Sequence, residues 1–388
     1  MIEIIDKKDC VGCEACVQRC PKSCISFNRD EQGFSYPRVD LVKCIHCNLC
    51  EKVCPVLNQY ESRIPQKIYA AKNKNIKIQK QSSSGGAFSS LSAQIIEAGG
   101  VVFGARFDKD WLVIHDYTES LDGLELFRGS KYSQSRIGHA YEDVEKFLKK
   151  GRKVLFTGTP CQIAGLKRFL NKDYGKLLLT IDVVCHGVPS PLIWQDYLIS
   201  KTRTLGYSLS DISSINFRDK RRGWSNYGME IKYDNKPFQE NFETLKNNEY
   251  MQGFLRDLYL RPSCYACPAK SGKSNSDVTL GDFWKIQNLK KEDYDDNGIS
   301  LVLVNSDTGL KILNEANLTM SESTYETAIV SNSSIIDSAK FSKYYSVFWN
   351  NYKDLGITAL GMTIKKARGP IWKRALRYFY KKIISFVK

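Results

Sequence analysis

The sequence lacks any uninterrupted apolar run of the roughly 18 residues that a membrane-spanning helix needs. It also lacks the apolar segment of a secretory leader, because its first ten residues, MIEIIDKKDC, mix charged and apolar side chains. Acidic residues are absent from 365–388, which holds nine Lys and Arg residues of a chain whose formal net charge is +15. We therefore expect a cytoplasmic protein whose excess positive charge is concentrated in one tail.

The 13 cysteines do not suit a disulfide framework, because cytoplasmic thiols stay reduced, and metal ligation is considered first. The segments CVGCEACVQRCP and CIHCNLCEKVCP repeat one pattern at an offset of 34 residues. In such repeats three closely spaced cysteines bind one 4Fe-4S cluster, and the fourth reaches the other cluster. Zinc in CxxC pairs is the alternative, but it needs no three-cysteine run that ends in Cys-Pro. The predicted ligands are Cys10, Cys13, Cys16 and Cys54 for the first cluster, and Cys44, Cys47, Cys50 and Cys20 for the second.

Residues 1–60 resemble the bacterial two-cluster ferredoxins, with all eight ligands present, and this resemblance implies a small α+β module. Between the two motifs, ISFNRDEQGFSYPRVD alternates in polarity and turns at Gly33, which predicts a β-hairpin. Cys24 fits no ligand position and is predicted to be a small buried residue. Linker-like composition places the end of the module near Pro65.

Residues 66–330 alternate between strand and helix patterns, which predicts an α/β domain with a mixed, partly parallel sheet. The clearest unit consists of KVLFTG, TPCQIAGLKRFL and LLLTIDVVCHG, which predict a strand, a helix and a second strand parallel to the first. Further strands are predicted in GGVVFGARFD, SDVTLGDF and ISLVLVNS, and helices in YEDVEKFLKKG and TGLKILNEA. The aromatic-rich segment after residue 340 is expected to pack on the body and to begin a helical tail over 340–388.

Cys161 and Cys185 each follow a strand of this unit, and parallel strands deliver their carboxyl ends to one edge of a sheet. We therefore expect the two thiols to be close in space. Cys264 and Cys267 form a further CxxCP motif, so four cysteines remain for a third 4Fe-4S cluster. Three alternatives stay open: inert buried thiols, a zinc site, and a nucleophilic Cys161 with His186 as its base.

Three short segments carry the residue types of a cofactor site. QSSSGGAF precedes a helix predicted over 87–98, where serine caps and glycines would leave backbone N–H groups free for a phosphate or pyrophosphate. The segment is neither GxGxxG nor a P-loop, and a plain capped helix is the alternative. RGSKYSQS places Lys131 and Tyr132 in a polar loop, where the lysine would steady a flavin ring or a phosphate, or lie in solvent. GDFW would border a planar ring or end its strand in the core.

The segments SSSGGAFSSL, GSKYSQS, TGTPCQIAGL, VVCHG, CYACP and SDVTLGDFW follow the order of one family. Residues 1 to about 315 resemble the beta subunits of coenzyme F-420-reducing hydrogenases and dehydrogenases, with a ferredoxin module fused in front, and plant hydroxymethyl-chlorophyll reductases are similar. The resemblance implies an FAD-containing iron–sulfur oxidoreductase, with the third cluster on Cys161, Cys185, Cys264 and Cys267 beside the flavin. The flavin-site residues that it implies are Ser84, Gly85, Gly86, Lys131, Tyr132, Gly158, Thr159, Gly281 and Asp282.

The predicted function is a relay of single electrons between 4Fe-4S clusters and a two-electron flavin-dependent reaction. Members with a fused ferredoxin module are common in bacteria, often near surface-polysaccharide genes, so the two-electron partner stays open among a substrate, a deazaflavin and a nicotinamide coenzyme. A one-electron donor or acceptor protein is the other expected partner. The alternatives are an electron-transfer subunit without its own substrate, docked to a catalytic partner, and a nucleic-acid-binding protein, for which no recognition motif is present.

The end of the chain, GPIWKRALRYFYKKIISFVK, places apolar and basic side chains on opposite faces of a predicted helix. Such a helix suits an anionic membrane surface at the inner face of the membrane, and docking on the body or on a partner is the alternative. We predict peripheral membrane binding through residues 366–388. The apolar face consists of Trp372, Leu376, Phe379, Tyr380, Ile383 and Val387.

Overall fold

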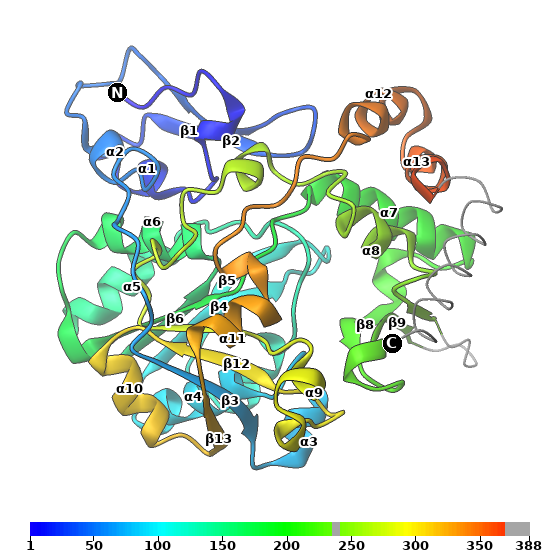
Figure 1. Ribbon diagram of the computed structural model, residues 1–388. Helices are drawn as coiled ribbons and strands as arrows, with labels where there is room; N and C mark the ends of the chain where they lie inside the picture. Colours follow the sequence, from blue (N-terminus) through cyan, green and yellow to red (C-terminus); the bar gives the residue numbers. More distant parts are fainter. Residues whose placement is uncertain (235–240, 369–388) are drawn as a thin grey trace.

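The computed structural model describes residues 1–234 and 241–368 of the 388-residue chain. Within them, the central sheet has eight strands in the order β13-β3-β12-β11-β7-β6-β4-β5 (Figure 1). Neighbours from β4 through β6 and β7 to β11 are parallel, and the other neighbours are antiparallel, so the predicted mixed, partly parallel sheet is confirmed. The strands are β3 (Lys67–Asn73), β4 (Val101–Phe107), β5 (Val113–Thr118), β6 (Val154–Gly158), β7 (Leu178–Val183), β11 (Val278–Asp282), β12 (Ser300–Val304) and β13 (Leu318–Ser323).

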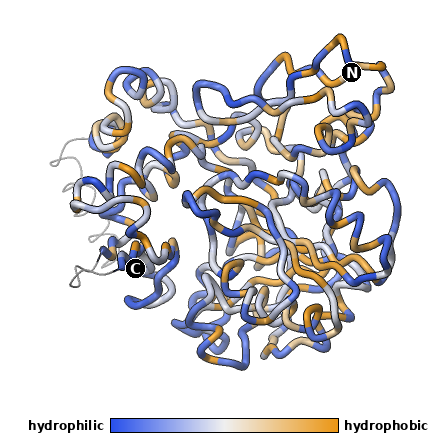
Figure 2. The backbone as a smooth tube through the Cα atoms, turned by 180° about the vertical axis from the view of Figure 1, so that it is seen from behind, coloured by the Kyte–Doolittle hydropathy of each residue, from blue (hydrophilic) through white to orange (hydrophobic). Residues whose placement is uncertain are grey.

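Helices cover both faces of this sheet, which explains why central strands such as β6 and β12 are mostly apolar (Figure 2). In β12, Val302 and Val304 belong to the core that includes α4 and α10, whereas Leu301 and Leu303 belong to the core that includes α9 and α11. The helices around the sheet are α3 (Ile76–Gln81), α4 (Ala87–Glu97), α5 (Ala140–Lys149), α6 (Pro160–Leu170), α9 (Ile286–Leu289), α10 (Asp307–Asn314) and α11 (Tyr325–Ser331).

The predicted strand–helix–strand unit is formed by β6, α6 and β7. Strands β6 and β7 are parallel, with Gly158 opposite Asp182 at their carboxyl ends. Helix α6 begins directly after β6, where Thr159 and Gln162 form a capping box and Pro160 occupies the first turn. The unit therefore carries the start of α6, with its cysteine, to the carboxyl edge of the sheet.

The N-terminal segment lies above the sheet in Figure 1, next to α5 and α6. The hairpin predicted within it is confirmed as β1 (Ile25–Arg29) paired with β2 (Ser35–Val39), and two short helices, α1 (Ala15–Gln18) and α2 (Leu49–Lys52), lie within the cysteine motifs. Gly33 has a φ of +81°, and a Cβ atom there would lie 2.4 Å from Leu192 Cβ. The hairpin turn thus requires glycine and packs closely against the chain at Leu192.

A second lobe, which was not predicted from the sequence, contains an antiparallel sheet in the order β10-β9-β8 (Figure 1). Its core buries Trp194, Tyr250 and Phe348, which confirms that the aromatic segment after residue 340 packs on the body. The elements are α7 (Pro191–Thr204), β8 (Ile212–Asp219), β9 (Gly228–Tyr233), β10 (Phe242–Thr244), α8 (Glu249–Phe254), α12 (Tyr345–Leu355) and α13 (Thr358–Arg368).

The predicted basic amphipathic helix over 366–388 lies outside the described residues, apart from residues 366–368 at the end of α13. Within the described part of the chain, none of the helices combines the length and the hydropathy that a transmembrane segment needs. Membrane binding through the tail therefore stays a prediction.

Candidate functional site

Cys10, Cys13, Cys16 and Cys54 lie together, although Cys54 belongs to the second motif. The pKa of the Cys16 thiol is raised, first by burial and then by the neighbouring Cys10 and Cys54 thiols. Burial likewise raises the pKa of Cys13, and Cys16, Cys54 and Cys10 raise it further. The structure thus brings the four predicted ligands of the first cluster together across the two motifs.

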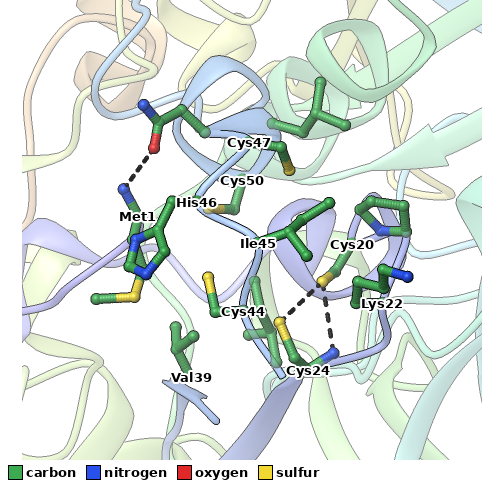
Figure 3. A pocket seen from close by; sticks show the side chains of 14 residues that line it. Met1, Cys20, Lys22, Cys24, Val39, Cys44, Ile45, His46, Cys47 and Cys50 are labelled. Atoms are coloured by element: carbon green, nitrogen blue, oxygen red, sulfur yellow. Dashed lines mark hydrogen bonds between the residues drawn. The ribbon is translucent and has the colours of Figure 1, made fainter. Parts of the chain in front are cut away.

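The second set of predicted ligands, together with Cys24, lines a cavity with apolar walls (Figure 3). Cys24 is buried, as predicted, but its Sγ lies 3.3 Å from that of Cys20, so it faces the ligand set. No local signal predicts this placement, because Cys24 lies outside both repeated motifs. The thiols around the cavity are Cys20, Cys24, Cys44, Cys47 and Cys50.

The two motifs also adopt the same backbone conformation. Glu14 and Asn48 each follow the second cysteine of their motif, and both have left-handed φ angles, of 59° and 56°. Each residue is the N-cap of the short helix that carries the next cysteine. Left-handed φ angles are uncommon in residues other than glycine, so two unrelated cysteine pairs are not expected to share them. Two equivalent loops that each surround a cluster are expected to share them.

The third set of thiols converges from three separate segments of the chain. Cys161 lies in the first turn of α6, and Cys185 follows the end of β7 at the same edge of the sheet. The pKa of Cys161 is raised to about 12, mainly by burial and then by the neighbouring Cys267 and Cys185 thiols. Burial, followed by Cys185, Cys267 and Cys161, raises the pKa of Cys264. The expected proximity of Cys161 and Cys185 is therefore met, and the CxxCP motif joins them.

Polar groups surround these sulfur atoms. The backbone N–H of Val188 donates to Cys264 Sγ at 3.4 Å, and Thr159 Oγ1 lies 3.2 Å from Cys161 Sγ. His186 Nε2 lies 2.6 Å from Asp257 Oδ1, so this ring is engaged with a carboxylate. A nucleophilic cysteine needs a lowered pKa, whereas that of Cys161 is raised, so the arrangement does not favour nucleophilic catalysis.

The thiols in the described ranges are not packed as ligands of one ion. Across residues 1–234 and 241–368, no group of three or more His, Cys, Asp or Glu side chains is arranged to hold a single metal ion. The three sets are instead groups of four neighbouring thiols, each drawn from more than one segment of the chain.

Helix α6 connects the first and third sets. A Cβ atom at Gly165 would lie 2.9 Å from Cys13 Cβ and 3.0 Å from Cys13 Sγ, so the N-terminal segment packs directly on this helix. Gly165 follows Cys161 by one helical turn and therefore lies on the same side of α6. The first set of thiols is consequently the one next to the third set.

Two side chains of the N-terminal segment hold it against α5. Glu14 accepts hydrogen bonds from the backbone N–H groups of Ile137 and Gly138, at 2.9 and 3.0 Å. Gln18 Oε1 accepts from the N–H groups of Tyr141 and Glu142 in the first turn of α5. A helix of one segment is thus capped by a side chain of another, which couples their positions.

The QSSSGG and GSKY segments meet at a hydrogen bond from the Ser130 N–H to Ser83 Oγ, 2.8 Å long. The expected serine cap of the helix after QSSSGG is wrong: Gly86, with a φ of +85°, is the N-cap of α4, because the left-handed backbone there disfavours other side chains. The first turn of α4 therefore has no side-chain cap. Ser84 Oγ donates to the Ile299 carbonyl at 2.7 Å, which fixes the loop.

Lys131 is partly buried in the same region. Its Nζ donates to the carbonyl oxygens of Arg128 and Gly129, at 3.1 and 3.2 Å. Burial lowers the pKa of Lys131 to about 7. The lysine is therefore not a solvated loop residue, and a nearby anion would favour its charged form.

Arg218, which was not predicted as a site residue, connects Tyr132 and Asp282. Its guanidinium donates to both carboxylate oxygens of Asp282, at 2.8 and 3.1 Å, and to Tyr132 Oη at 3.3 Å. Trp224 Nε1 donates to Asp282 Oδ1, and the ring of Trp224 stacks on Trp284. Asp282 of the GDFW motif is thus held by Arg218 of β8. No local sequence pattern around Arg218 indicates that it is a site residue.

Two parts of the chain match known protein families. Residues 151–327 match the family of the C-terminal region of the beta subunit of coenzyme F420 hydrogenase/dehydrogenase, and residues 9–58 match the family described as 4Fe-4S dicluster domain. A stretch of 205 residues is 26% identical to the Coenzyme F420-dependent sulfite reductase of Methanocaldococcus jannaschii, covering 51% of this chain and 31% of that protein. A further 52 residues, 13% of this chain, are 36% identical to an uncharacterized ferredoxin of the same organism, of which they cover 66%.

This chain therefore spans less than two thirds of the length of either relative. Among solved structures, a chain of the F420-reducing NiFe hydrogenase complex from Methanosarcina barkeri is similar with a TM-score of 0.48 and 17% identity, over 70% of this chain and 89% of that chain.

Proposed function

Residues 151–327 belong to the coenzyme F420 hydrogenase/dehydrogenase beta-subunit family and residues 9–58 to the 4Fe-4S dicluster domain family, and from this premise we propose that the chain is an iron–sulfur flavoprotein oxidoreductase. One observation carries the proposal: four partly buried thiols from separate segments converge at the carboxyl edge of the sheet, next to the ferredoxin-type thiols. When bound, the flavin would supply two-electron chemistry and the clusters single-electron transfer.

The residues present fit three 4Fe-4S clusters. In the first and third sets, burial and neighbouring thiols disfavour free thiolates, and binding to iron would remove that penalty. The cavity of the second set has an apolar wall and sulfur atoms directed inward (Figure 3). We propose that Cys10, Cys13, Cys16 and Cys54 hold the first cluster, Cys20, Cys44, Cys47 and Cys50 the second, and Cys161, Cys185, Cys264 and Cys267 the third.

Three features support a flavin near the third set. The start of α4 has no side-chain cap, which leaves backbone N–H groups for a phosphate or pyrophosphate. Gly158 and Thr159 lie directly before the turn that carries Cys161, so any ring bound there would be near the third set. Lys131 is joined to the loop before α4 through Ser130 and Ser83, and its ammonium would balance an anionic ring or phosphate.

A second function is an electron-transfer subunit without its own substrate, docked to a catalytic partner. The relative that covers half of this chain is itself much longer, since the match spans 31% of it. The oxygens of Asp282 are already bonded to Arg218 and Trp224, which leaves this acid without an obvious ligand role. In this case the four thiols of the third set would pass electrons directly to the partner.

Anaerobic purification with iron, sulfide and flavin measured on the same sample separates these functions. We expect about 12 irons, as three cubanes of four irons require, and about one FAD per chain. About 12 irons without flavin would favour the electron-transfer subunit. About eight irons would show that the third set of thiols holds no cluster and would overturn the proposal.

A further inference from the structure

Arg261 is a buried charged residue that the proposed function leaves unexplained. Its guanidinium donates two hydrogen bonds to Cys10, one to the carbonyl oxygen at 2.7 Å and one to Sγ at 3.4 Å. The other N–H groups reach Gln134 Oε1 at 3.1 Å and the Ser35 carbonyl at 3.0 Å. None of these four acceptors is a carboxylate.

A buried cation needs a compensating negative charge. Glu14 interacts electrostatically with Arg261, but its carboxylate accepts hydrogen bonds from the backbone of Ile137 and Gly138 instead. A 4Fe-4S cluster in its oxidised state, together with four thiolates, carries a charge of about −2. Bound to Cys10 and its partners, such a cluster would supply the counter-charge that the guanidinium lacks.

The chain makes room for this arginine beside the first motif. Gly12, between Cys10 and Cys13, has a φ of +71°, and a Cβ atom there would lie 2.7 Å from Arg261 Nη1 and 2.4 Å from Gln134 Nε2. The rings of Phe34 and Tyr36 flank the guanidinium, with centroids 5.5 and 4.4 Å away. The arginine is therefore held from several sides and cannot move without repacking the first motif.

The backbone of Arg261 is joined to the third set. Its carbonyl accepts a hydrogen bond of 2.9 Å from the N–H of Cys264, and the 3₁₀ helix Pro262–Ala266 begins directly after it. The charge of Arg261 also acts on Cys161. Arg261 thus contacts Cys10, a proposed ligand of the first cluster, through its side chain. It contacts Cys264, a proposed ligand of the third cluster, through its backbone.

We propose that Arg261 is a positioning residue that fixes the first cluster relative to the third and raises the reduction potential of the first. Reduction adds one electron and no proton to the cluster, and a buried cation that bonds Cys10 Sγ stabilises the added charge. The electron comes from the one-electron donor of the proposed function. The inference rests on that function for the presence of the clusters, and it needs no flavin.

Redox titration followed by EPR on anaerobically purified full-length protein tests this role, with dithionite as reductant. In Arg261→Gln, the equilibrium constant for one-electron reduction of the first cluster should fall about tenfold, which is a shift of about 59 mV to more negative potential. The second cluster, identified through a Cys47→Ser variant, should keep its potential. Arg261→Lys keeps the charge but not the planar fork and should shift the first cluster less.

Arg19→Gln is the matched control, because it removes an arginine of the same module. The Arg19 side chain is 33% exposed, forms an ion pair with Glu145 at 3.6 Å and lies over the ring of Phe169. A first-cluster potential equal to that of the natural protein, or a shift no larger than the control's, would overturn the proposal. If Arg261→Gln is unable to bind iron, Arg261→Lys is the variant to measure. A first-cluster potential in Arg261→Lys equal to that in Arg19→Gln would then overturn the proposal. An iron content of about eight would reject the third cluster while leaving the first-cluster potential measurable, so the two failures can be told apart.

Discussion

Gly165 of α6 packs against Cys13, with room for hydrogen but not for a methyl group: a Cβ atom at Gly165 would lie 2.9 Å from Cys13 Cβ. Cys161 lies one turn earlier on the same helix. This contact places the first predicted cluster beside the third, and the cavity of the second set lies within the N-terminal segment. Electrons entering at the second cluster would therefore pass the first on their way to the third.

Gly165→Ala should disturb the first cluster. The added methyl group has no space between Cys13 and the oxygen of Tyr141, and overpacking of this kind costs about 1–3 kcal/mol. We expect the EPR signal of the first cluster to be lost or broadened in anaerobically purified protein. Gly361→Ala is the control, because its Cβ atom would meet only the flexible end of Glu249. An unchanged first-cluster signal in Gly165→Ala would contradict the packing described above.

Cys161→Ser should remove the third cluster and leave the ferredoxin-type clusters in place. Iron should fall from about 12 to about eight per chain, because one cubane of four irons is lost. Cys24→Ser should retain about 12, because Cys24 faces the second set without being one of its four proposed ligands. Iron analysis of both variants against the natural protein measures this difference. Equal iron in Cys161→Ser and the natural protein would remove Cys161 from the ligand set.

Gln18→Ala should loosen the N-terminal segment from α5. The variant loses the acceptor for two N–H groups of the first turn of α5, at Tyr141 and Glu142, and the loss of such a cap costs about 1 kcal/mol. Hydrogen exchange should become faster at these two amides. Gln66→Ala, which removes an exposed side-chain contact to Asp307, should leave them unchanged. Equal exchange in both variants would show that Gln18 does not cap α5.

The pH dependence of FAD binding should report on Lys131. Burial lowers its pKa to about 7, so the side chain is charged at pH 6 and largely neutral at pH 8.5. If its charge balances the bound cofactor, binding takes up a proton above pH 7, and the dissociation constant of FAD should rise by up to about tenfold per pH unit. Fluorescence titration of flavin-depleted protein measures this rise.

Lys131→Met should bind FAD more weakly at pH 6 and lose the rise between pH 6 and 8.5. Lys131→Arg, which stays charged over this range, should also lose the rise while keeping tighter binding than Lys131→Met. The same pH dependence in the natural protein and in Lys131→Met would show that the lysine does not contact the cofactor.

The first two ligand sets were predictable because their information is local. The spacing of Cys10, Cys13 and Cys16, repeated at Cys44, fixes which thiols can wrap one cluster, and the structure groups them accordingly. The proximity of Cys161 to a distant cysteine followed from parallel strands alone. These inferences needed no knowledge of the rest of the chain.

The contacts of Arg261 and Arg218 with distant segments were not predictable. Arg261 lies 251 residues from Cys10 in sequence, and nothing around it resembles a cluster motif. Arg218 lies in a lobe that was not predicted at all, because buried and exposed residues do not alternate along its strand β8. The sequence predicts a serine cap, whereas Gly86 is the N-cap of α4. A Cβ atom there would lie 3.1 Å from Asn73 Cβ and 3.2 Å from Ser82 Oγ, and local propensity does not indicate these contacts.

Anomalous diffraction at the iron absorption edge, on crystals grown without oxygen, tests the central claim most directly. The account predicts three iron peaks, with the third enclosed by the sulfur atoms of Cys161, Cys185, Cys264 and Cys267. Two iron peaks, or a zinc-edge peak between those four residues, would contradict it.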